Sequence, residues 1–133
     1  MAKLKNIVFI GNTNNYPLIL ALGFKKIGFR VSIFVNHKDP LHRPENLIND
    51  FKKNYPDWII DISQFLDNDI ILGNESAIKL IRKYTDSADL VILNDIGHSI
   101  YTILYSPFIS LFTGSDLTYY GSYRILFNRF YSV

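Results

Sequence analysis

The chain of 133 residues is 48% hydrophobic and 15% aromatic, and its 14 basic and 12 acidic residues leave a formal net charge of +2. This length and composition fit one domain with a large core and exclude a disordered chain. The balanced charge provides no basic face for duplex nucleic acid, and the lack of cysteine excludes disulfides, thiolate zinc sites and thiol nucleophiles.

The N-terminal part of the chain predicts a strand–helix–strand unit. Residues 5–10 form a continuous apolar run, which is typical of a strand buried on both faces of a parallel sheet. This run is too short for a signal peptide and has no small-residue cleavage site after it, so we expect a cytoplasmic protein. Gly11 ends the strand, Pro17 begins a helix that ends at Gly28, and residues 30–35 form the second strand.

The rest of the chain continues this alternation. We expect a short helix over residues 45–53, an interruption at 55–58, a short strand over 69–72, a helix over 75–84, a strand over 89–94, a short helix over 99–104 and a strand over 107–112. Alternating strands and helices predict one α/β domain over residues 1–133, a Rossmann-like three-layer sandwich with a mostly parallel sheet. No apolar stretch approaches the ~18 residues that a transmembrane helix needs.

Polar loops follow the predicted strands, at the edge where open parallel sheets bind ligands. These loops are Gly11–Tyr16, Asn36–Asp39 with His42 and Arg43 close behind, Asn94–Ser99 and Thr113–Asp116. Together they would bring all three histidines to one rim of the sheet. We therefore expect a site at this rim, a single cleft on which five side chains converge: Asn12, Asp95, His98, Ser115 and Asp116.

Several of these residues also have a purely structural interpretation. Residues 11–15 fit either an asparagine-rich turn or a phosphate site at a helix N-terminus. They lack both the three-glycine dinucleotide fingerprint and a Walker lysine, so we expect no nicotinamide or ATP site and no cofactor. His37, His42 and Arg43 fit solvated loop residues as well as ligands.

Asp95 and His98 form the most informative pair. A carboxylate three residues before an imidazole fits the orientation of a general base. A structural interpretation is equally open, in which Asn94 and Asp95 cap the short helix that follows them. The histidines of the chain lack the spacing of a zinc site, so we expect no metal.

Five segments of the sequence resemble one enzyme family. They are KNIVFIGNTNN, HKDPLHRPE, YPDW, ADLVILNDIG and PFISLFTGSDL, and they extend over most of the chain. Their order and spacing are similar to the N-terminal domain of GT-B fold glycosyltransferases, the class that includes many bacterial surface-polysaccharide enzymes. In that family two Rossmann-like domains face each other across a cleft. The N-terminal domain mainly holds the acceptor, and the C-terminal domain mainly holds the nucleotide sugar.

The resemblance implies the acceptor-side domain of a glycosyltransferase. Such an enzyme transfers a sugar from a nucleotide-sugar donor to a glycan or lipid-linked acceptor in cell-surface glycan synthesis. It implies donor-phosphate contacts at Gly11, Asn12 and Thr13, catalytic roles for Asp95 and His98, and contacts to the acceptor or the sugar at Gly114, Ser115 and Asp116. Asp116 equally fits the cap of a following helix.

The sequence has no counterpart of the family's C-terminal donor-binding domain. We therefore expect this chain alone to be inactive, as a truncated chain, a natural fragment or one subunit of a split enzyme. Apolar residues along 119–131 predict self-association or docking to a partner chain. We expect a cytoplasmic location, with peripheral membrane contact left open. The alternative is a stand-alone nucleotide-binding or interaction module of flavodoxin-like topology, without transferase activity.

Overall fold

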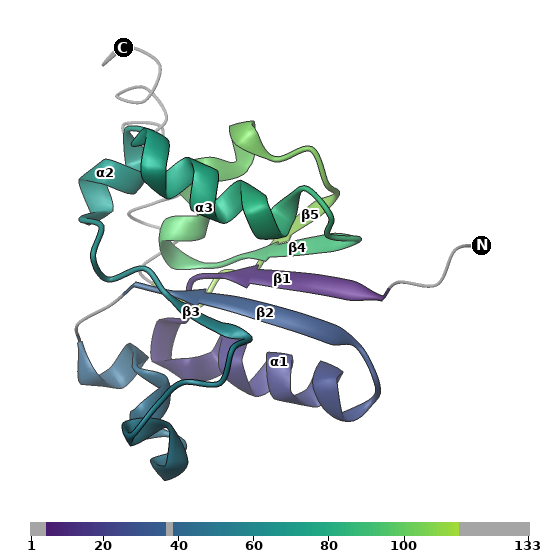
Figure 1. Ribbon diagram of the computed structural model, residues 1–133, viewed down its shortest axis with the longest axis vertical. Helices are drawn as coiled ribbons and strands as arrows, with labels where there is room; N and C mark the ends of the chain where they lie inside the picture. Colours follow the sequence, from purple (N-terminus) through teal and green to yellow (C-terminus); the bar gives the residue numbers. More distant parts are fainter. Residues whose placement is uncertain (1–4, 37–38, 115–133) are drawn as a thin grey trace.

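A computed structural model describes residues 5–36 and 39–114 of the chain. Its sheet contains five strands: β1 (Asn6–Ile10), β2 (Arg30–Val35), β3 (Ile59–Asp61), β4 (Leu90–Leu93) and β5 (Phe108–Ser110). Their order is β3-β2-β1-β4-β5, and every neighbouring pair is parallel (Figure 1). The predicted α/β class and Rossmann-like parallel sheet are therefore confirmed, and the first two predicted strands are parallel neighbours.

Helices cover both faces of this sheet. α1 (Tyr16–Lys26) packs on one face, whereas α2 (Asp67–Ile71) and α3 (Glu75–Thr85) pack on the other (Figure 1). Short 3-10 helices lie in the connections: η1 (Thr13–Asn15), η2 (Pro40–His42), η3 (Pro44–Asn46), η4 (Asn49–Lys52) and η5 (Asp95–Ile103). As predicted, Pro17 lies in the first turn of α1, and Gly28 follows its end with a left-handed φ of 98°.

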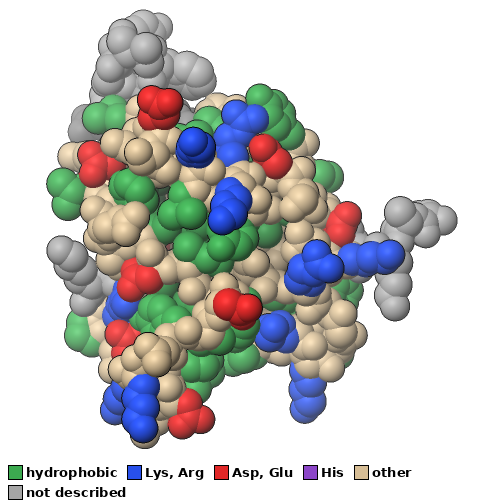
Figure 2. Space-filling model, in the orientation of Figure 1, with side chains coloured by type: hydrophobic (Ala, Val, Ile, Leu, Met, Phe, Trp, Pro, Cys, Tyr) green, Lys and Arg blue, Asp and Glu red, His purple; other side chains and the backbone are tan. Residues whose placement is uncertain are grey.

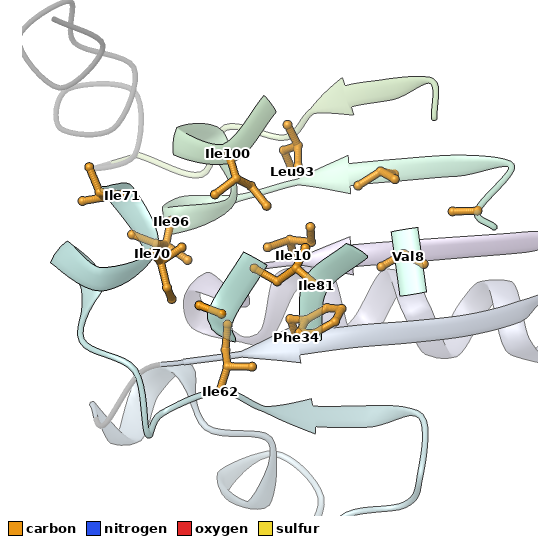
Figure 3. Packing of buried hydrophobic residues seen from close by; sticks show 13 residues of the cluster. Val8, Ile10, Phe34, Ile62, Ile70, Ile71, Ile81, Leu93, Ile96 and Ile100 are labelled. Carbon is orange, nitrogen blue, oxygen red and sulfur yellow. The ribbon is translucent and has the colours of Figure 1, made fainter. Parts of the chain in front are cut away.

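Alternate side chains of the strands enter two hydrophobic clusters. Val8 and Ile10 of β1 lie in the cluster on the α3 side, where they meet Ile81 of α3 (Figure 3). Phe9 of the same strand lies in the cluster on the α1 side, with Leu18 of α1. All five side chains are fully buried. Burial of both faces explains why the central strands read as continuous apolar runs.

The structure corrects the expectation of a strand over residues 69–72. Most of this segment belongs to the helix α2. The carboxylate of Asp69 accepts a hydrogen bond of 2.9 Å from the N–H of Leu66, which satisfies a backbone donor at the start of the helix. Ile70 and Ile71 are buried in the cluster on the α3 side, so the short apolar run reflects core packing of a helix.

The strand β3 has no counterpart among the predicted elements. It follows the expected interruption at residues 55–58 directly and pairs with β2 over only three positions, Ile33↔Ile59 to Val35↔Asp61. Three residues are too few to produce a periodic signal in the sequence. The helix expected over 45–53 is instead two short 3-10 helices, η3 and η4, and the helix expected over 99–104 is part of the longer η5.

No helix within residues 5–36 and 39–114 combines the length and apolar character of a membrane span. His37, Ser115, Asp116 and the segment 119–131 lie outside the described residues. The roles expected for them therefore stay predictions.

Candidate functional site

The loops that follow the strands gather at one rim, because all five strands run in the same direction. The chain moves from β1 to β2 on one side, and later places β4 on the other side of β1. The carboxyl ends of β1 and β4 therefore flank the point at which the strand order reverses. In open α/β sheets, this crevice is the usual ligand position.

Two glycines allow the ends of β1 and β4 to come into direct contact. Gly11 has a φ of 96°, and a Cβ at this position would lie 2.0 Å from the carbonyl oxygen of Asn94. A Cβ on Gly97 would lie 2.4 Å from the carbonyl oxygen of Ile10. Both distances are far below any van der Waals contact. Glycine is therefore required at both positions for a structural reason, independent of any ligand.

The side chain of Asn94 connects three of the rim loops. Its Oδ1 accepts a hydrogen bond of 2.9 Å from the N–H of Thr13, in the loop after β1. Its Nδ2 donates to the carbonyl oxygen of Leu111 at 2.9 Å and to Oγ1 of Thr113 at 3.0 Å, both after β5. Asn94 is fully buried and makes no side-chain cap to η5, so its role is to hold these loops together.

The loop after β1 is held by hydrogen bonds within the chain. Oδ1 of Asn12 accepts from the N–H of Leu18 at 3.1 Å, and Nδ2 of Asn12 donates to Asn15 at 2.7 Å and to the carbonyl oxygen of His42 at 2.9 Å. The N–H of Asn14 donates to Nδ1 of His42 at 2.8 Å. These contacts favour the interpretation of the loop as an asparagine-rich turn. A donor phosphate at this loop would have to replace several of them.

Asp95 and His98 lie together on η5, directly after β4. Asp95 is 4% exposed, and its φ of 51° is uncommon for any residue other than glycine. Its Cβ lies 3.3 Å from the position of a Cβ on Gly11, so Asp95 begins η5 directly beside the loop after β1. His98 is 7% exposed, and its ring stacks on Phe112 with 4.5 Å between ring centroids. An acidic residue with a left-handed φ, buried near a buried imidazole after a central strand, makes Asp95 and His98 candidates for a functional site.

A second polar cluster lies at the ends of β2 and β3. The guanidinium of Arg43 donates to Asp61 at 2.7 and 3.3 Å, to Oγ of Ser63 at 2.9 Å and to Glu45 at 3.2 Å. The hydroxyl of Tyr55 donates to the other oxygen of Glu45. Arg43 is thus neither a solvated loop residue nor an obvious ligand. It connects the segment after β2 to the end of β3.

The protonation equilibria of this cluster reflect these contacts. Burial alone would raise the pKa of Asp61, but hydrogen bonds from Arg43 and Ser63 and the charge of Arg43 outweigh it and lower that pKa. The pKa of Glu45 is also lowered, because hydrogen bonds from Tyr55 and Arg43 outweigh its burial. Burial and the bond to Glu45 raise the pKa of the Tyr55 hydroxyl. The two carboxylates therefore stay ionised against the fixed charge of Arg43.

The structure brings most of the described candidate residues to the rim. Gly11, Asn12 and Thr13 lie in the loop after β1, beside Asp95 and His98 of η5. Gly114 follows Thr113, whose hydroxyl meets Asn94. The bridging role of Asn94 has no signal in the sequence, because it depends on how closely the segment after β5 approaches β4.

The described residues contain no group of three or more histidine, aspartate or glutamate side chains that could hold a metal ion. Comparison of the chain with protein-family models, curated proteins and solved structures finds no match. The fold and the geometry of the rim therefore carry the functional argument.

Proposed function

We propose that the chain is the acceptor-side domain of a glycosyltransferase that uses a nucleotide-sugar donor. The observation that carries the proposal is the buried pair Asp95 and His98 at the crevice between β1 and β4. The all-parallel sheet supports it, because the resemblance implies a Rossmann-like domain and the observed order 3-2-1-4-5 is that of the Rossmann fold. A flavodoxin-like sheet has the order 2-1-3-4-5, so that part of the alternative is wrong.

In this proposal Asp95 positions His98, and the imidazole receives the proton of the acceptor hydroxyl as the new glycosidic bond forms. The carboxylate stabilises the imidazolium that results. The rate enhancement comes from holding the acceptor and from stabilising the departing diphosphate. Groups on the far side of that diphosphate must come from a second domain or chain. For this reason the chain alone should not turn over.

Ligand binding by the whole chain tests this function. We expect saturation-transfer NMR to show binding of a glycan or lipid-linked sugar acceptor, which Asp95→Asn and His98→Gln weaken roughly tenfold, equivalent to about 1.4 kcal/mol. The matched control is Thr85→Val, which changes a buried side chain in α3, outside the rim. This control should bind as the natural chain does.

Two outcomes would contradict the proposal. Sugar release from a panel of nucleotide sugars by the chain alone would overturn the assignment as half of an enzyme. Binding of nucleotides but of no glycan, unaffected by Asp95→Asn and His98→Gln, would instead support a stand-alone nucleotide-binding module.

A further inference from the structure

The solvent face of α1 carries a ridge of apolar side chains. Pro17, Leu18 and Ala21 face the sheet and are buried. The residues at helical spacing on the opposite side, which we call the α1 ridge, are Tyr16, Ile19, Leu20, Gly23 and Ile27. The four large side chains of the ridge are 54%, 50%, 44% and 71% exposed, respectively. An ordinary surface helix carries polar residues on this side.

The opposite face of the sheet follows the ordinary pattern. The outer surface of α3 carries charged side chains, among them Glu75, Lys79, Arg82 and Lys83. The apolar ridge is therefore particular to α1 and is not a general property of this surface. Contiguous exposed apolar groups of this kind mark a contact with another molecule or with a membrane.

Basic side chains accompany the α1 ridge. Lys25 and Lys26 lie in the last turn of α1, which contains no acidic residue. Lys52 and Lys53 lie at the end of η4, on the same side of the sheet, because neighbouring Phe51 packs into the cluster that contains α1. Figure 2 shows Lys and Arg side chains along its lower margin, over the end of α1 and over η4. Asp39, Asp50 and Asp57 are exposed acids in the neighbouring segments, so these four lysines give this side a small positive excess among the described residues.

The shape of the ridge distinguishes between possible partners. An α-helix of 11 residues is about 16 Å long. One convex ridge of this length falls short of the roughly 800 Å² per partner that a stable protein interface buries. A bilayer interface, by contrast, accepts the apolar face of a single helix to a depth of about 5–10 Å and adds attraction between lysines and anionic headgroups.

We propose that the α1 ridge inserts into the interfacial region of an anionic lipid bilayer, with the nearby lysines at the level of the lipid phosphates. Tyr16 then presents an aromatic ring with a polar hydroxyl at the boundary between lipid and water. Apart from Tyr16, where the rim loop after β1 joins α1, this surface lies away from the rim, so the proposal does not depend on the proposed enzymatic function.

Vesicle binding of the whole chain tests the ridge. We expect the chain to co-sediment with phosphatidylcholine vesicles that contain about 30% phosphatidylglycerol, and much less with phosphatidylcholine alone. The double variant Ile19→Gln/Ile27→Gln should reduce binding by roughly tenfold. Its matched control is Leu66→Gln/Leu72→Gln, which changes two exposed leucines near α2 and should bind as the natural chain does.

A second pair of variants tests the contribution of the lysines. Lys26→Gln/Lys52→Gln should weaken binding to the anionic vesicles, whereas Lys79→Gln/Lys83→Gln on α3 should not. Salt near 1 M should weaken binding of the natural chain in the same way, because it shortens the Debye length to about 3 Å.

Several results would overturn the proposal. The first is failure of the chain to bind anionic vesicles. The second is an equal loss of binding in Ile19→Gln/Ile27→Gln and in its control. The third is vesicle binding that neither Lys26→Gln/Lys52→Gln nor salt weakens. Sedimentation of the chain without lipid gives a further outcome. A dimer that dissociates in Ile19→Gln/Ile27→Gln would show that a second copy, and not lipid, covers the α1 ridge.

Discussion

The two halves of the rim are held together by different chemistry. At the ends of β1 and β4, backbone atoms touch across Gly11 and Gly97, and the neutral side chain of Asn94 joins three loops. At the ends of β2 and β3, ionised side chains hold the segments together. Arg43 forms an ion pair with Asp61, and both side chains remain partly exposed to water.

The two halves should therefore differ in what disturbs them: added side-chain atoms in one half, and pH or salt in the other. The β1–β4 half has no space for an added atom, and its amide hydrogen bonds do not depend on pH. The contacts of the β2–β3 half depend instead on the ionisation of carboxylates and on screening by salt. The candidate pair Asp95 and His98 stands on the first half. Its surroundings are therefore set largely by close backbone packing and by hydrogen bonds of neutral groups.

The largest expected effect is that of Gly11→Ala. The added Cβ would lie 2.0 Å from the carbonyl oxygen of Asn94, and the φ of 96° is itself unfavourable for alanine. We expect a loss of roughly 3 kcal/mol or more in the free energy of unfolding, measured by urea denaturation. Gly28→Ala is the matched control, because Gly28 has a φ of 98° but no atom near its Cβ position. It should cost only about 1 kcal/mol. Equal losses would show that backbone strain, and not the close contact, requires Gly11.

Asn94→Ala should have the next largest effect. It leaves the N–H of Thr13 and the carbonyl oxygen of Leu111 without the partner that Asn94 provides. Unfolding free energy should fall by about 2 kcal/mol, and the Thr13 amide should exchange faster with solvent in NMR. The loss should be the same at acidic and neutral pH. A strong pH dependence would contradict the neutral character of this half.

Asp61→Asn tests the charged half and should have a smaller effect. Because the pKa of Asp61 is lower in the folded state, its contribution is present above the unfolded value near 4 and is lost as the pH falls through the folded pKa. At neutral pH we expect the variant to lose about 1 kcal/mol, a modest amount because Asp61 is partly exposed. At pH values below the folded pKa of Asp61, the variant and the natural chain should unfold alike. A loss that does not shrink as the pH falls would show that packing, and not charge, is the cause.

The smallest effect concerns His42, which joins the two halves through the N–H of Asn14. In His42→Asn the side-chain oxygen lies near the position of Nδ1 and can still accept this bond, whereas in His42→Gln it lies farther from the backbone. We expect Gln to cost about 0.5–1 kcal/mol and Asn less. Thermal unfolding of the two variants at one pH makes the comparison. The reverse order would show that the Nδ1 contact does not stabilise the loop.

Much of the fold could be predicted because its central strands are buried on both faces and therefore form uninterrupted apolar runs. The runs around Val8, Ile33 and Val91 mark β1, β2 and β4, and the amphipathic pattern of α3 marks that helix. The edge strand β3 pairs with one neighbour over three positions and leaves no such run. Ile70 and Ile71 were predicted as part of a strand because a short apolar run indicates burial but does not distinguish a buried strand from a buried helix.

The rim was predictable in place but not in detail. Parallel strands oblige their following loops to share one edge, so Asp95 and the loop at Gly11 had to be neighbours once the sheet was known. The bonds of Asn94 and Arg43 depend instead on exact distances between segments far apart in the chain. No local pattern encodes such distances, which is why Arg43 could not be distinguished from a solvated residue.

The central position of β1 also has a consequence for the order of folding. As the chain leaves the ribosome, β1 can pair with β2 early, but its other edge must await β4. The carboxylate of Asp89, which accepts from the N–H of Asn6, lies 83 positions downstream. Until that point the nascent chain carries an open strand edge and a half-covered apolar sheet, the kind of surface that recruits chaperones. Closure around β1 is therefore a late, long-range event, and folding should be slow for a chain of this size.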